Sequence, residues 1–384
     1  MQLIFLLSLV LIAYAYVGYP IVLWCLAIMK KGPRIQEEPS WTPNVSLLIS
    51  VYNEEAILEE KLLNSLKLDY PRKRLEIVVI SDGSTDRTEA IAKEFADQGV
   101  VLKSYPGRIG KTACLNQVMA ATSGEIVIFS DANSMYAPHV VRALIEPFAD
   151  PTIGYVTGGT SYVSDASGKM GESIGLYSRL ERMTKLLESR IGSCVGADGA
   201  MFAIRRSLYE PLDRADINDL VIPLRIVRAG FRGIYAPRAS CAEVAAKETT
   251  REFSRQVRIA ARTIRAVMTH RALLNPFRYG LFAFQFMSHK FCKLIVPFLL
   301  LAALVSNAAL MGAGTLYLVT LVLQLVVYGT ASIAMRSATL HQSGSVIKRL
   351  LDVAQSFILV NVAVAVAWVR YWKGESFTTW APAR

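Results

Sequence analysis

The sequence has few cysteines and histidines, and neither residue type is arranged as a metal site or a disulfide framework. Its five cysteines are scattered without a C-x-x-C spacing, and its four histidines lie far apart in the chain. Zinc sites and redox motifs require closely spaced residues of these types, so the sequence predicts neither. Scattered single cysteines are typical of reduced thiols in a protein that faces the cytosol.

The two common nucleotide-binding motifs are also missing. No G-x-G-x-x-G follows the first apolar run, at 45–51. The stretch "GRIGKT" (107–112) ends like a P-loop, but that motif requires a glycine where this chain has Tyr105. The sequence therefore disfavours a P-loop ATPase, although a nucleotide can still bind in a different way.

Charged residues are scarce, and the acidic ones are outnumbered. They make up 19% of the chain against 53% hydrophobic residues, and the formal net charge is +11. No basic run is interleaved with aromatic residues, so the sequence predicts no nucleic-acid partner. The basic excess is instead explained by membrane topology and by contact with anionic membrane lipids.

Long apolar segments predict an integral membrane protein. Candidate spans lie at 3–29, 294–312, 315–335 and 353–369, of which the last is the shortest. Lys30, Lys31 and Arg34 follow the first of them directly. Because basic residues stay on the cytoplasmic side, we expect a multi-pass protein of the cell inner or plasma membrane, with residues 30–280 in the cytoplasm.

Between these spans, apolar strands alternate with helical stretches. Strands are predicted at 45–51, 75–81, 100–104 and 125–130. Continuous apolar strands separated by helices predict a parallel sheet covered on both faces, which is a doubly wound α/β fold. In such sheets, ligands bind beyond the carboxyl ends of the strands.

Polar residues gather at these strand ends. They are Asn53 and Glu54 after the first strand, Asp82 and Asp86 after the second, and Asp131 and Asn133 after the fourth. Taken singly, each is explained equally well as a helix cap or a turn residue. Several polar clusters at one edge of one sheet predict instead a single crevice.

Five segments, in this order, resemble the membrane-anchored family 2 glycosyltransferases. They are "SVYNEE" (50–55), "VVISDGSTDRT" (78–88), "GKTACLN" (110–116), "FSDANS" (129–134) and "GADGAMFAIRR" (196–206). That group includes cellulose, hyaluronan and other exopolysaccharide synthases and lipid-linked sugar transferases. The resemblance covers about residues 44–265. It implies a GT-A fold, a nucleotide-sugar donor (most often a UDP-sugar) and inversion at the anomeric carbon.

The resemblance implies a donor site at the strand ends. In the family, acidic residues of the first two segments hold the nucleobase and ribose. Here Asn53 and Glu54 match the first segment and Asp82 the second, so these three residues are predicted to bind the nucleotide. Lys111 matches the lysine near the base and the diphosphate. A lysine can neutralise the negative charge that develops on the leaving phosphate.

Asp131 opens the segment that matches the D-x-D motif of the family, where the first carboxylate lies near the donor sugar or ribose and the last usually binds a metal. Here that last position is Asn133. An amide oxygen can ligate Mg²⁺ or Mn²⁺, which favour oxygen ligands. We therefore expect Asp131 and Asn133 to bind one of these ions more weakly than two carboxylates would.

Inversion requires a base that removes the proton of the acceptor hydroxyl. The family keeps an aspartate for this step in a "TED"-like triplet at a helix start, and "IND" (217–219) matches it, so Asp219 is the predicted base. Asp216 is the nearest competitor and is expected to be the helix N-cap. Asp198 and Gly199 lie where the family contacts the acceptor sugar, although Asp198 is equally well explained as a turn residue.

The chain departs from the family at the Q-x-x-R-W motif. Arg255 and Arg258 keep the arginine spacing, but Ile259 replaces the tryptophan. Basic residues recur at helical spacing in 251–267, which predicts an interfacial helix on anionic lipid, arginines that close over the donor diphosphate, or both. The missing tryptophan weakens the case for a long-polymer synthase. Glu243, at a recurrent acidic position of the family, is expected only to support the site.

The predicted organisation is a transmembrane helix at 1–30, a cytoplasmic GT-A domain at 31–249, amphipathic interfacial helices at 250–292, transmembrane helices at 293–371 and a tail at 372–384. The leading hypothesis is a membrane-bound inverting hexosyltransferase that acts on a lipid-linked or polysaccharide acceptor. Two alternatives are open: a processive synthase that also translocates its polymer, and a non-catalytic GT-A-like scaffold. The acidic set of Asp82, Asp131 and Asp219 argues against the scaffold.

Overall fold

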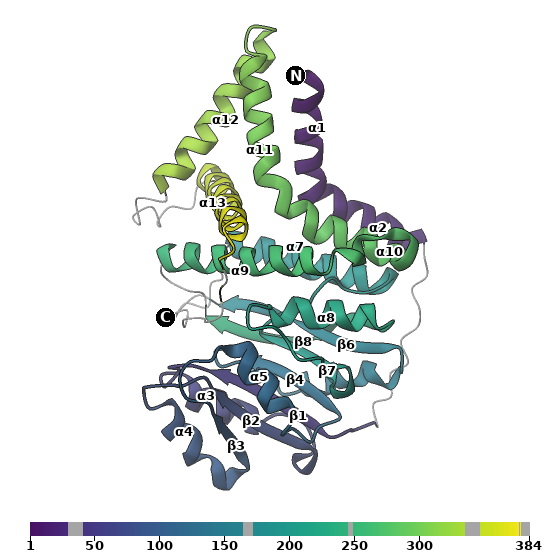
Figure 1. The fold of residues 1–384 in the computed structure, drawn as a ribbon, viewed down its shortest axis with the longest axis vertical. Coiled ribbons are helices and arrows are strands. Elements are labelled where there is room, and N and C mark those ends of the chain that lie inside the picture. Colours follow the sequence, from purple (N-terminus) through teal and green to yellow (C-terminus); the bar gives the residue numbers. More distant parts are fainter. Residues whose placement is uncertain (30–40, 164–171, 245–248, 335–345, 376, 378–384) are drawn as a thin grey trace. The chain divides into compact units, whose positions relative to one another are not determined.

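The computed structural model of the 384-residue chain describes residues 1–29, 41–163, 172–244, 249–334, 346–375 and 377 (Figure 1). The chain divides into two compact units. The α/β unit comprises Leu23–Ala245, Asn275–Phe282 and Phe377–Arg384, and the helical unit comprises Met1–Val22, Ala246–Leu274 and Ala283–Ser376. Lys30, Lys31 and Arg34 lie outside the described residues.

The α/β unit is built on an eight-stranded sheet with the order β3-β2-β1-β4-β7-β6-β8-β5. The strands are β1 (Val45–Val51), β2 (Leu75–Ser81), β3 (Val100–Ser104), β4 (Ile126–Asp131), β5 (Met135–Tyr136), β6 (Ile153–Val163), β7 (Met201–Arg205) and β8 (Arg232–Val244). The strands from β1 to β4 pair in parallel, as the sequence predicted.

The second half of the sheet, to which the prediction of parallel strands did not extend, is not parallel throughout. Strand β7 runs antiparallel to both β4 and β6, β6 pairs in parallel with β8, and β5 runs antiparallel to β8. The antiparallel entry of β7 returns the segment that precedes it to the carboxyl end of β4. The sheet is therefore mixed, and the reversal occurs beside the predicted donor site.

Burial explains why the parallel strands read as continuous apolar runs. Every residue of β1 is buried, and β2 and β4 are buried along almost their whole length. Strands covered on both faces have no solvent-facing positions that would alternate with apolar ones. Leu47 and Ile49 of β1 pack with Ile77 of β2 and Ile128 of β4 in one continuous core.

Six helices of the α/β unit accompany this sheet in the described residues: α3 (Leu58–Leu66), α4 (Thr88–Glu94), α5 (Lys111–Met119), α6 (Val140–Ile145), α7 (Glu172–Ile191) and α8 (Asn218–Arg228). The first of them begins only at Leu58, seven residues after the last residue of β1, Val51. Asn53 has a left-handed backbone with φ of 51°, and the amides of Ile57 and Leu58 bond to the Glu54 carbonyl. That turn delays the helix.

The helices of the remaining segments are α1 (Gln2–Ala13), α2 (Tyr19–Met29), α9 (Thr249–Thr269), α10 (Pro276–Phe286), α11 (Cys292–Ala309), α12 (Thr315–Ala334) and α13 (Val346–Trp372). Single π-helical turns join α1 to α2 at Tyr14–Gly18 and α10 to α11 at Met287–Phe291. The Tyr14 hydroxyl lies 2.7 Å from the Ser288 hydroxyl, so a hydrogen bond joins the two turns inside the helical unit.

Three helical stretches of the described residues are long and apolar enough to cross a membrane. They are Gln2–Met29, Pro276–Ala309 and Val353–Trp372. The fourth predicted span, at 315–335, contains a shorter apolar helical segment, Thr315–Gly329. Length and composition thus support three of the four predicted spans.

Candidate active site

The predicted donor residues follow neighbouring strands of the parallel half of the sheet. Val51 pairs with Ser81 on β2, and Ser50 pairs with Asp131 on β4. The Asp82 amide also donates to the Val51 carbonyl at 3.2 Å. The structure therefore brings the ends of β1, β2 and β4, and the polar residues that follow them, to one edge of the sheet.

Asp82 is a fully buried carboxylate at this edge. Its Oδ1 accepts the Gly110 N–H at 2.9 Å and lies 3.5 Å from the Cys114 thiol. Burial, followed by the nearby charge of Asp82, raises the pKa of Cys114, so this thiol stays protonated and can donate to Asp82. Among the residues that the structure describes, the buried Oδ2 has no hydrogen-bond partner. A buried acceptor in this condition is costly, and a ligand hydroxyl or N–H would satisfy it.

Lys111 and Asp131 are in direct contact. The Lys111 Nζ lies 2.5 Å from the Asp131 Oδ1, and both side chains are partly open to solvent. Lys111 is the first residue of α5, and Gly110 before it has a φ of 94°, a backbone that a residue with a Cβ adopts only at a cost. This turn lets one loop direct an N–H at Asp82 and an ammonium at Asp131.

The side chain of Asn53 connects the loops after β1 and β2. Its Oδ1 accepts the Thr85 N–H at 2.8 Å, and its amide nitrogen donates to the Thr85 hydroxyl at 3.3 Å. The backbone N–H of Glu54 donates to the Thr88 hydroxyl at 2.8 Å. Asp86 accepts the N–H of Thr88, the first residue of α4. Asn53 and Asp86 thus shape the loops, and the nucleotide contacts of Asn53 and Glu54 stay predictions.

A stacked pair at the same edge was not singled out from the sequence. The Arg108 guanidinium lies over the ring of Tyr52, 3.6 Å from its centroid. Both residues lie within the motifs "SVYNEE" and "GRIGKT", and Arg108 has a left-handed backbone with φ of 52°. A flat cation on an aromatic face, next to Asp82 in the folded sheet edge, is a surface on which a nucleobase can stack. The sequence feature that could have indicated this pair is the presence of a tyrosine and an arginine in two loops that are predicted to meet at one crevice.

The turn after β4 provides a sparse set of metal ligands. Asp131 supplies one carboxylate and the half-buried Asn133 one amide oxygen. No group of three or more histidine, cysteine, aspartate or glutamate side chains suited to a metal occurs in the part of the chain that the structure describes. Mg²⁺ is commonly held by one or two carboxylates together with substrate phosphates. The two residues therefore fit an ion that is bound mainly by a diphosphate.

A buried lysine holds the turn after β4 through a hydrogen bond. Lys61 of α3 is fully buried, donates to the carbonyl of Ser134, and lies 3.8 Å from the centroid of the Tyr136 ring. The Ser134 hydroxyl in turn donates to Glu243 Oε1 at 2.5 Å, which is the supporting position expected for Glu243. Burial lowers the pKa of Lys61 to about 7, although Asp131 and Glu243 partly oppose the shift.

Asp219, the second residue of α8, lies against the "GADGA" segment. The Ala197 N–H donates to the Asp219 carbonyl at 2.7 Å. A Cβ added to Gly199 would lie only 2.7 Å from the Asp219 Oδ2. Gly199 therefore leaves the space that this carboxylate occupies.

The pairing of β7 with β4 brings the "GADGA" segment to the sheet edge where the predicted donor residues lie. Met201 pairs with Ser130, so the residues before Met201 lie beside Asp131 at the end of β4. The predicted base, the predicted acceptor segment and the predicted donor residues are thereby brought together in the α/β unit.

Both carboxylate oxygens of Asp198 accept hydrogen bonds from the protein. Oδ1 accepts from the Thr160 hydroxyl at 2.9 Å and from the Ala200 N–H at 3.2 Å, and Oδ2 accepts the Thr160 N–H at 3.0 Å. Asp198 therefore holds β6 against the "GADGA" segment. Its contact with an acceptor sugar stays a prediction.

Asp216 is not the N-cap of α8, contrary to the expectation from sequence. Ile217 occupies that position, and α8 has no side-chain cap. The Asp216 Oδ2 instead accepts from the Arg225 guanidinium at 3.2 Å and from the Asp213 N–H at 3.0 Å. An ion pair with a guanidinium replaces the weaker cap interaction, because Arg225 of the same helix faces the loop.

Arg255 and Arg258 lie on α9, in the helical unit. They follow the amphipathic pattern that the sequence predicted for this helix. Their role at the donor diphosphate stays a prediction.

The fold of this chain is similar to that of a solved glycosyltransferase with the GT-A fold. The mannosyltransferase PcManGT from Pyrobaculum calidifontis, solved with GDP-Man and Mn²⁺, has a TM-score of 0.72 over 97% of this chain and 100% of that chain, at 22% identity. This similarity confirms the predicted GT-A fold with its apolar flanking helices.

The family follows from the sequence. Residues 46–212 match the model of Glycosyl transferase family 2, so this chain carries a family 2 glycosyltransferase domain, as its motifs predicted. The probable glycosyltransferase YdaM of Bacillus subtilis is 28% identical over 221 residues, which cover 54% of this chain and 52% of YdaM.

Two further relatives have products in their names. The beta-monoglucosyldiacylglycerol synthase of Synechocystis is 36% identical over 116 residues, which cover 29% of this chain and 24% of that protein. The poly-beta-1,6-N-acetyl-D-glucosamine synthase of Staphylococcus aureus is 28% identical over 204 residues, which cover 51% of this chain and 49% of the synthase. The matches thus span about half or less of the relatives' length.

Replacing Lys61 by methionine should change how stability depends on pH. The pKa of Lys61 is about 7 in the folded protein, against an ordinary value of 10.5, so between these values the unfolded chain binds more protons. The wild type should therefore gain stability relative to Lys61→Met as pH rises above 7, at up to about 1.4 kcal/mol per pH unit. Unfolding midpoints of both proteins in detergent from pH 6 to 9 would measure this. Parallel pH profiles would contradict it.

Proposed function

We propose that this chain is a membrane-bound inverting glycosyltransferase that transfers a sugar from a nucleotide-sugar, with a UDP-sugar as the first candidate, to a lipid-linked or polysaccharide acceptor. The observation that carries the proposal is the meeting of three features at the edge of the sheet where β1, β2 and β4 end. These are the buried oxygen of Asp82, the contact between Lys111 and Asp131, and the packing of Gly199 on Asp219. A donor, a leaving-group cation and a base are all required for this reaction, and the family 2 domain supports the assignment.

On the donor side, Asp82 accepts hydrogen bonds from the nucleoside, which stacks on the pair formed by Tyr52 and Arg108. Lys111 exchanges part of its contact with Asp131 for the diphosphate and neutralises the charge that develops on it. When bound by Asp131 and Asn133, Mg²⁺ or Mn²⁺ supplies further electrostatic stabilisation of the leaving diphosphate.

On the acceptor side, Asp219 acts as the general base. The acceptor oxygen forms its bond to the anomeric carbon while the bond from that carbon to the phosphate oxygen breaks. The hydroxyl proton passes to the Asp219 carboxylate, and the electron pair of the broken bond stays on the diphosphate. A carboxylate is a weak base toward an alcohol, so the proton moves late, after the attack has made the hydroxyl acidic.

The acceptor class is supported by the relatives and by the apolar helices. One relative is named for a glucosylated diacylglycerol and another for a polymer of N-acetylglucosamine. Three stretches of this chain are apolar enough to span a bilayer, which would hold the site near a lipid-borne acceptor. The length of the product separates a single transfer from processive synthesis, because only the latter gives a ladder of long chains.

The proposed location is the plasma membrane, with the α/β unit in the cytoplasm. Nucleotide-sugars are cytoplasmic metabolites, so a donor site on that side is the simplest arrangement. Lys30, Lys31 and Arg34, which follow the first apolar helix in the sequence, support the same orientation under the positive-inside rule.

Asp219→Asn should abolish most of the transfer activity. An amide cannot accept the hydroxyl proton, so we expect kcat to fall by about 10²- to 10⁴-fold, while affinity for the nucleoside diphosphate stays near that of the wild type. Release of nucleoside diphosphate from a panel of UDP- and GDP-sugars, with Mg²⁺ or Mn²⁺ and a membrane-lipid extract as acceptor, would measure this. Asp97→Asn, at an exposed site, is the matched control. Full activity in Asp219→Asn, or no donor consumed by the wild type, would refute the proposal.

Gly199→Ala should impair the same step without changing any charged residue. Its methyl group would lie 2.7 Å from the Asp219 Oδ2, so the carboxylate has to move. We expect kcat to fall by about tenfold or more, because small displacements of a catalytic group are costly, while the KM for the donor changes little. The unfolding midpoint controls for loss of fold. A normal kcat in a folded variant would mean that Gly199 does not hold the base in place.

Asn133→Asp should strengthen the dependence on metal. A second carboxylate adds negative charge to the site, so half-maximal activation is expected at an about tenfold lower Mn²⁺ concentration. Titration of Mn²⁺ against nucleoside diphosphate release measures the change, with Asn133→Ala as the variant that lacks the amide oxygen. Identical Mn²⁺ titrations for the three proteins would show that residue 133 is only part of a turn.

A further inference from the structure

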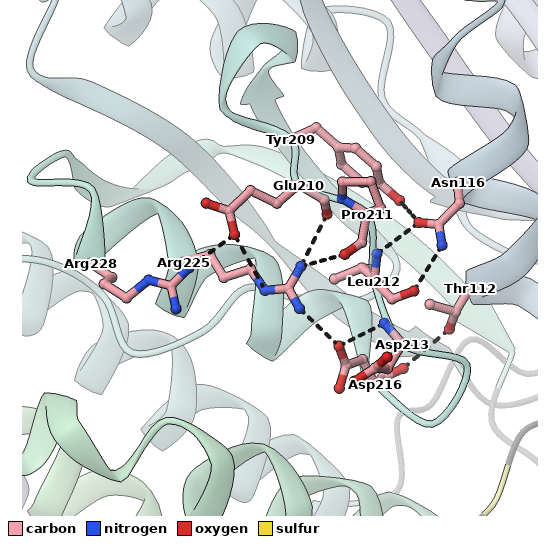
Figure 2. Close-up of polar contacts among 10 residues, drawn as sticks. All are labelled: Thr112, Asn116, Tyr209, Glu210, Pro211, Leu212, Asp213, Asp216, Arg225 and Arg228. Atoms are coloured by element: carbon pink, nitrogen blue, oxygen red, sulfur yellow. Dashed lines mark hydrogen bonds and ion pairs between the residues drawn. The ribbon is translucent and has the colours of Figure 1, made fainter.

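A polar network joins helix α5 to the loop 209–216, which leads into α8 (Figure 2). The side chain of Asn116 is its first part. The Asn116 Nδ2 donates to the Leu212 carbonyl at 2.8 Å, and its Oδ1 accepts the Leu212 N–H at 2.9 Å and the Tyr209 hydroxyl at 2.7 Å. The amide thus pairs with both backbone groups of Leu212, as a neighbouring strand would, and fixes that residue in two directions.

Thr112 provides a second attachment on the same face of α5. It lies one helical turn before Asn116, is buried, and donates its hydroxyl hydrogen to the Asp216 carbonyl at 3.2 Å. Residues Leu212 and Asp216 are therefore both held by α5. They lie shortly before Asp219 in the chain, so the loop has little freedom between its attachments and the predicted base.

Arg225 holds the loop from the other side, from the second half of α8 (Figure 2). Its Nη1 donates to the carbonyls of Glu210 and Pro211, at 3.2 and 2.7 Å, and its Nη2 lies 3.2 Å from the Asp216 Oδ2. The side chains of Arg225 and Asp216 are only 15% and 5% exposed, so solvent screens this ion pair weakly. By contrast, Arg228 meets Glu210 on the exposed rim at 2.9 Å.

The start of α8 has no cap of its own. Its N-cap is Ile217, whose apolar side chain cannot accept hydrogen bonds from the first N–H groups of the helix. The position of the first turn, which contains Asp219, therefore depends on the loop before it and on the Ala197 N–H that donates to the Asp219 carbonyl. Asn116 and Arg225 provide most of the side-chain hydrogen bonds to that loop.

Helix α5 also carries the donor contacts. Gly110 and Lys111 at its start bind Asp82 and Asp131, and Asn116 lies about 7–8 Å further along the helix axis. One short, continuous helix therefore contacts the donor carboxylates at one end and the loop of the base at the other. This helix thus links the donor carboxylates to the loop that precedes the predicted base.

We infer that Asn116 and Arg225 are positioning residues, which hold Asp219 in register with the donor carboxylates. This inference rests on the proposed function for its effect on the reaction. Neither residue needs to touch donor or acceptor. Their hydrogen bonds are directional, and a displacement of about 1 Å at a catalytic group can lower a rate about a hundredfold.

Three substitutions test the inference through kinetics. Asn116→Ala and Arg225→Gln should lower kcat for nucleoside diphosphate release by about ten- to a hundredfold, with the KM for the donor within about twofold of wild type. Asn116→Asp keeps the acceptor oxygen and should give an intermediate kcat. Arg228→Gln, which removes only the exposed pair with Glu210, is the matched control and should keep the wild-type kcat.

A second measurement does not depend on turnover. The amides of Leu220 and Val221 bond to the Ile217 carbonyl in the first turn of α8. Hydrogen exchange of these amides, measured by mass spectrometry on the full chain in detergent, should be faster in Asn116→Ala and Arg225→Gln than in wild type and Arg228→Gln. Affinity for UDP or GDP should be the same in all four proteins.

The outcomes separate this inference from the proposed function. Unchanged exchange in the first turn of α8, an unchanged kcat, or a parallel loss of kcat and nucleotide affinity in Asn116→Ala and Arg225→Gln would overturn the inference. A wild-type protein that consumes no donor would refute the proposed function. In that case the exchange measurement would still decide whether Asn116 and Arg225 hold the loop.

Discussion

The antiparallel pairing of β7 with β4 is the interaction on which the site depends. It places Met201 opposite Ser130, so the chain just before β7 passes the end of β4, where Asp131 lies. The rings of Phe129 and Phe202, on adjacent strands, stack with centroids 4.6 Å apart and planes inclined by 19°. Because a shift of one residue would turn every side chain of β7 to the other face, this buried aromatic pair fixes the register together with the backbone hydrogen bonds.

Two lysines and two carboxylates lie near the end of β4. Asp131 is paired with the partly exposed Lys111, and the buried Lys61 lies near Asp131 and Glu243. The charges of these four side chains balance one another when all four are ionised. An amide at position 133 keeps this balance, whereas a carboxylate there would add an uncompensated negative charge next to the diphosphate.

The parallel half of the fold could be predicted from sequence because its strands are continuous apolar runs. The shared position of the candidate donor residues at one sheet edge could be predicted because they follow those strands directly. The antiparallel half could not. Strand β7 pairs with β4, from which it is far removed in sequence, and β6 and β8 contain the small and polar stretches "GGTS" and "RASCAEV" that give no clear strand pattern. The "GADGA" segment could therefore be singled out by its motif, but its position in the sheet could not be predicted.

The contacts of two single side chains could not be predicted from sequence for a related reason, because their partners lie outside the local turn. Lys61 lies on an amphipathic helix where a lysine is usually exposed, and it is buried only because the turn at Ser134 and Tyr136 covers it. Asp216 precedes a helix in the manner of an N-cap, but Arg225 at the other end of that helix turns back to pair with it. Spacing in the sequence predicts hydrogen bonds between neighbouring residues. It does not predict when a side chain forms a stronger ion pair with a residue outside its own turn.

The segment "GKTACLN" shows how the spacing of a motif follows from helix geometry. Lys111 is at the start of α5, where its side chain reaches the donor edge. Cys114 lies on the face that meets Asp82, whereas Thr112 and Asn116, one turn apart, share the face that meets the loop before α8. Each polar position of the motif therefore has its own partner, and the helix between them acts as a rigid spacer. A substitution that keeps the helix but removes one of these contacts should affect either donor binding or the proposed deprotonation of the acceptor, according to which side the contact is on.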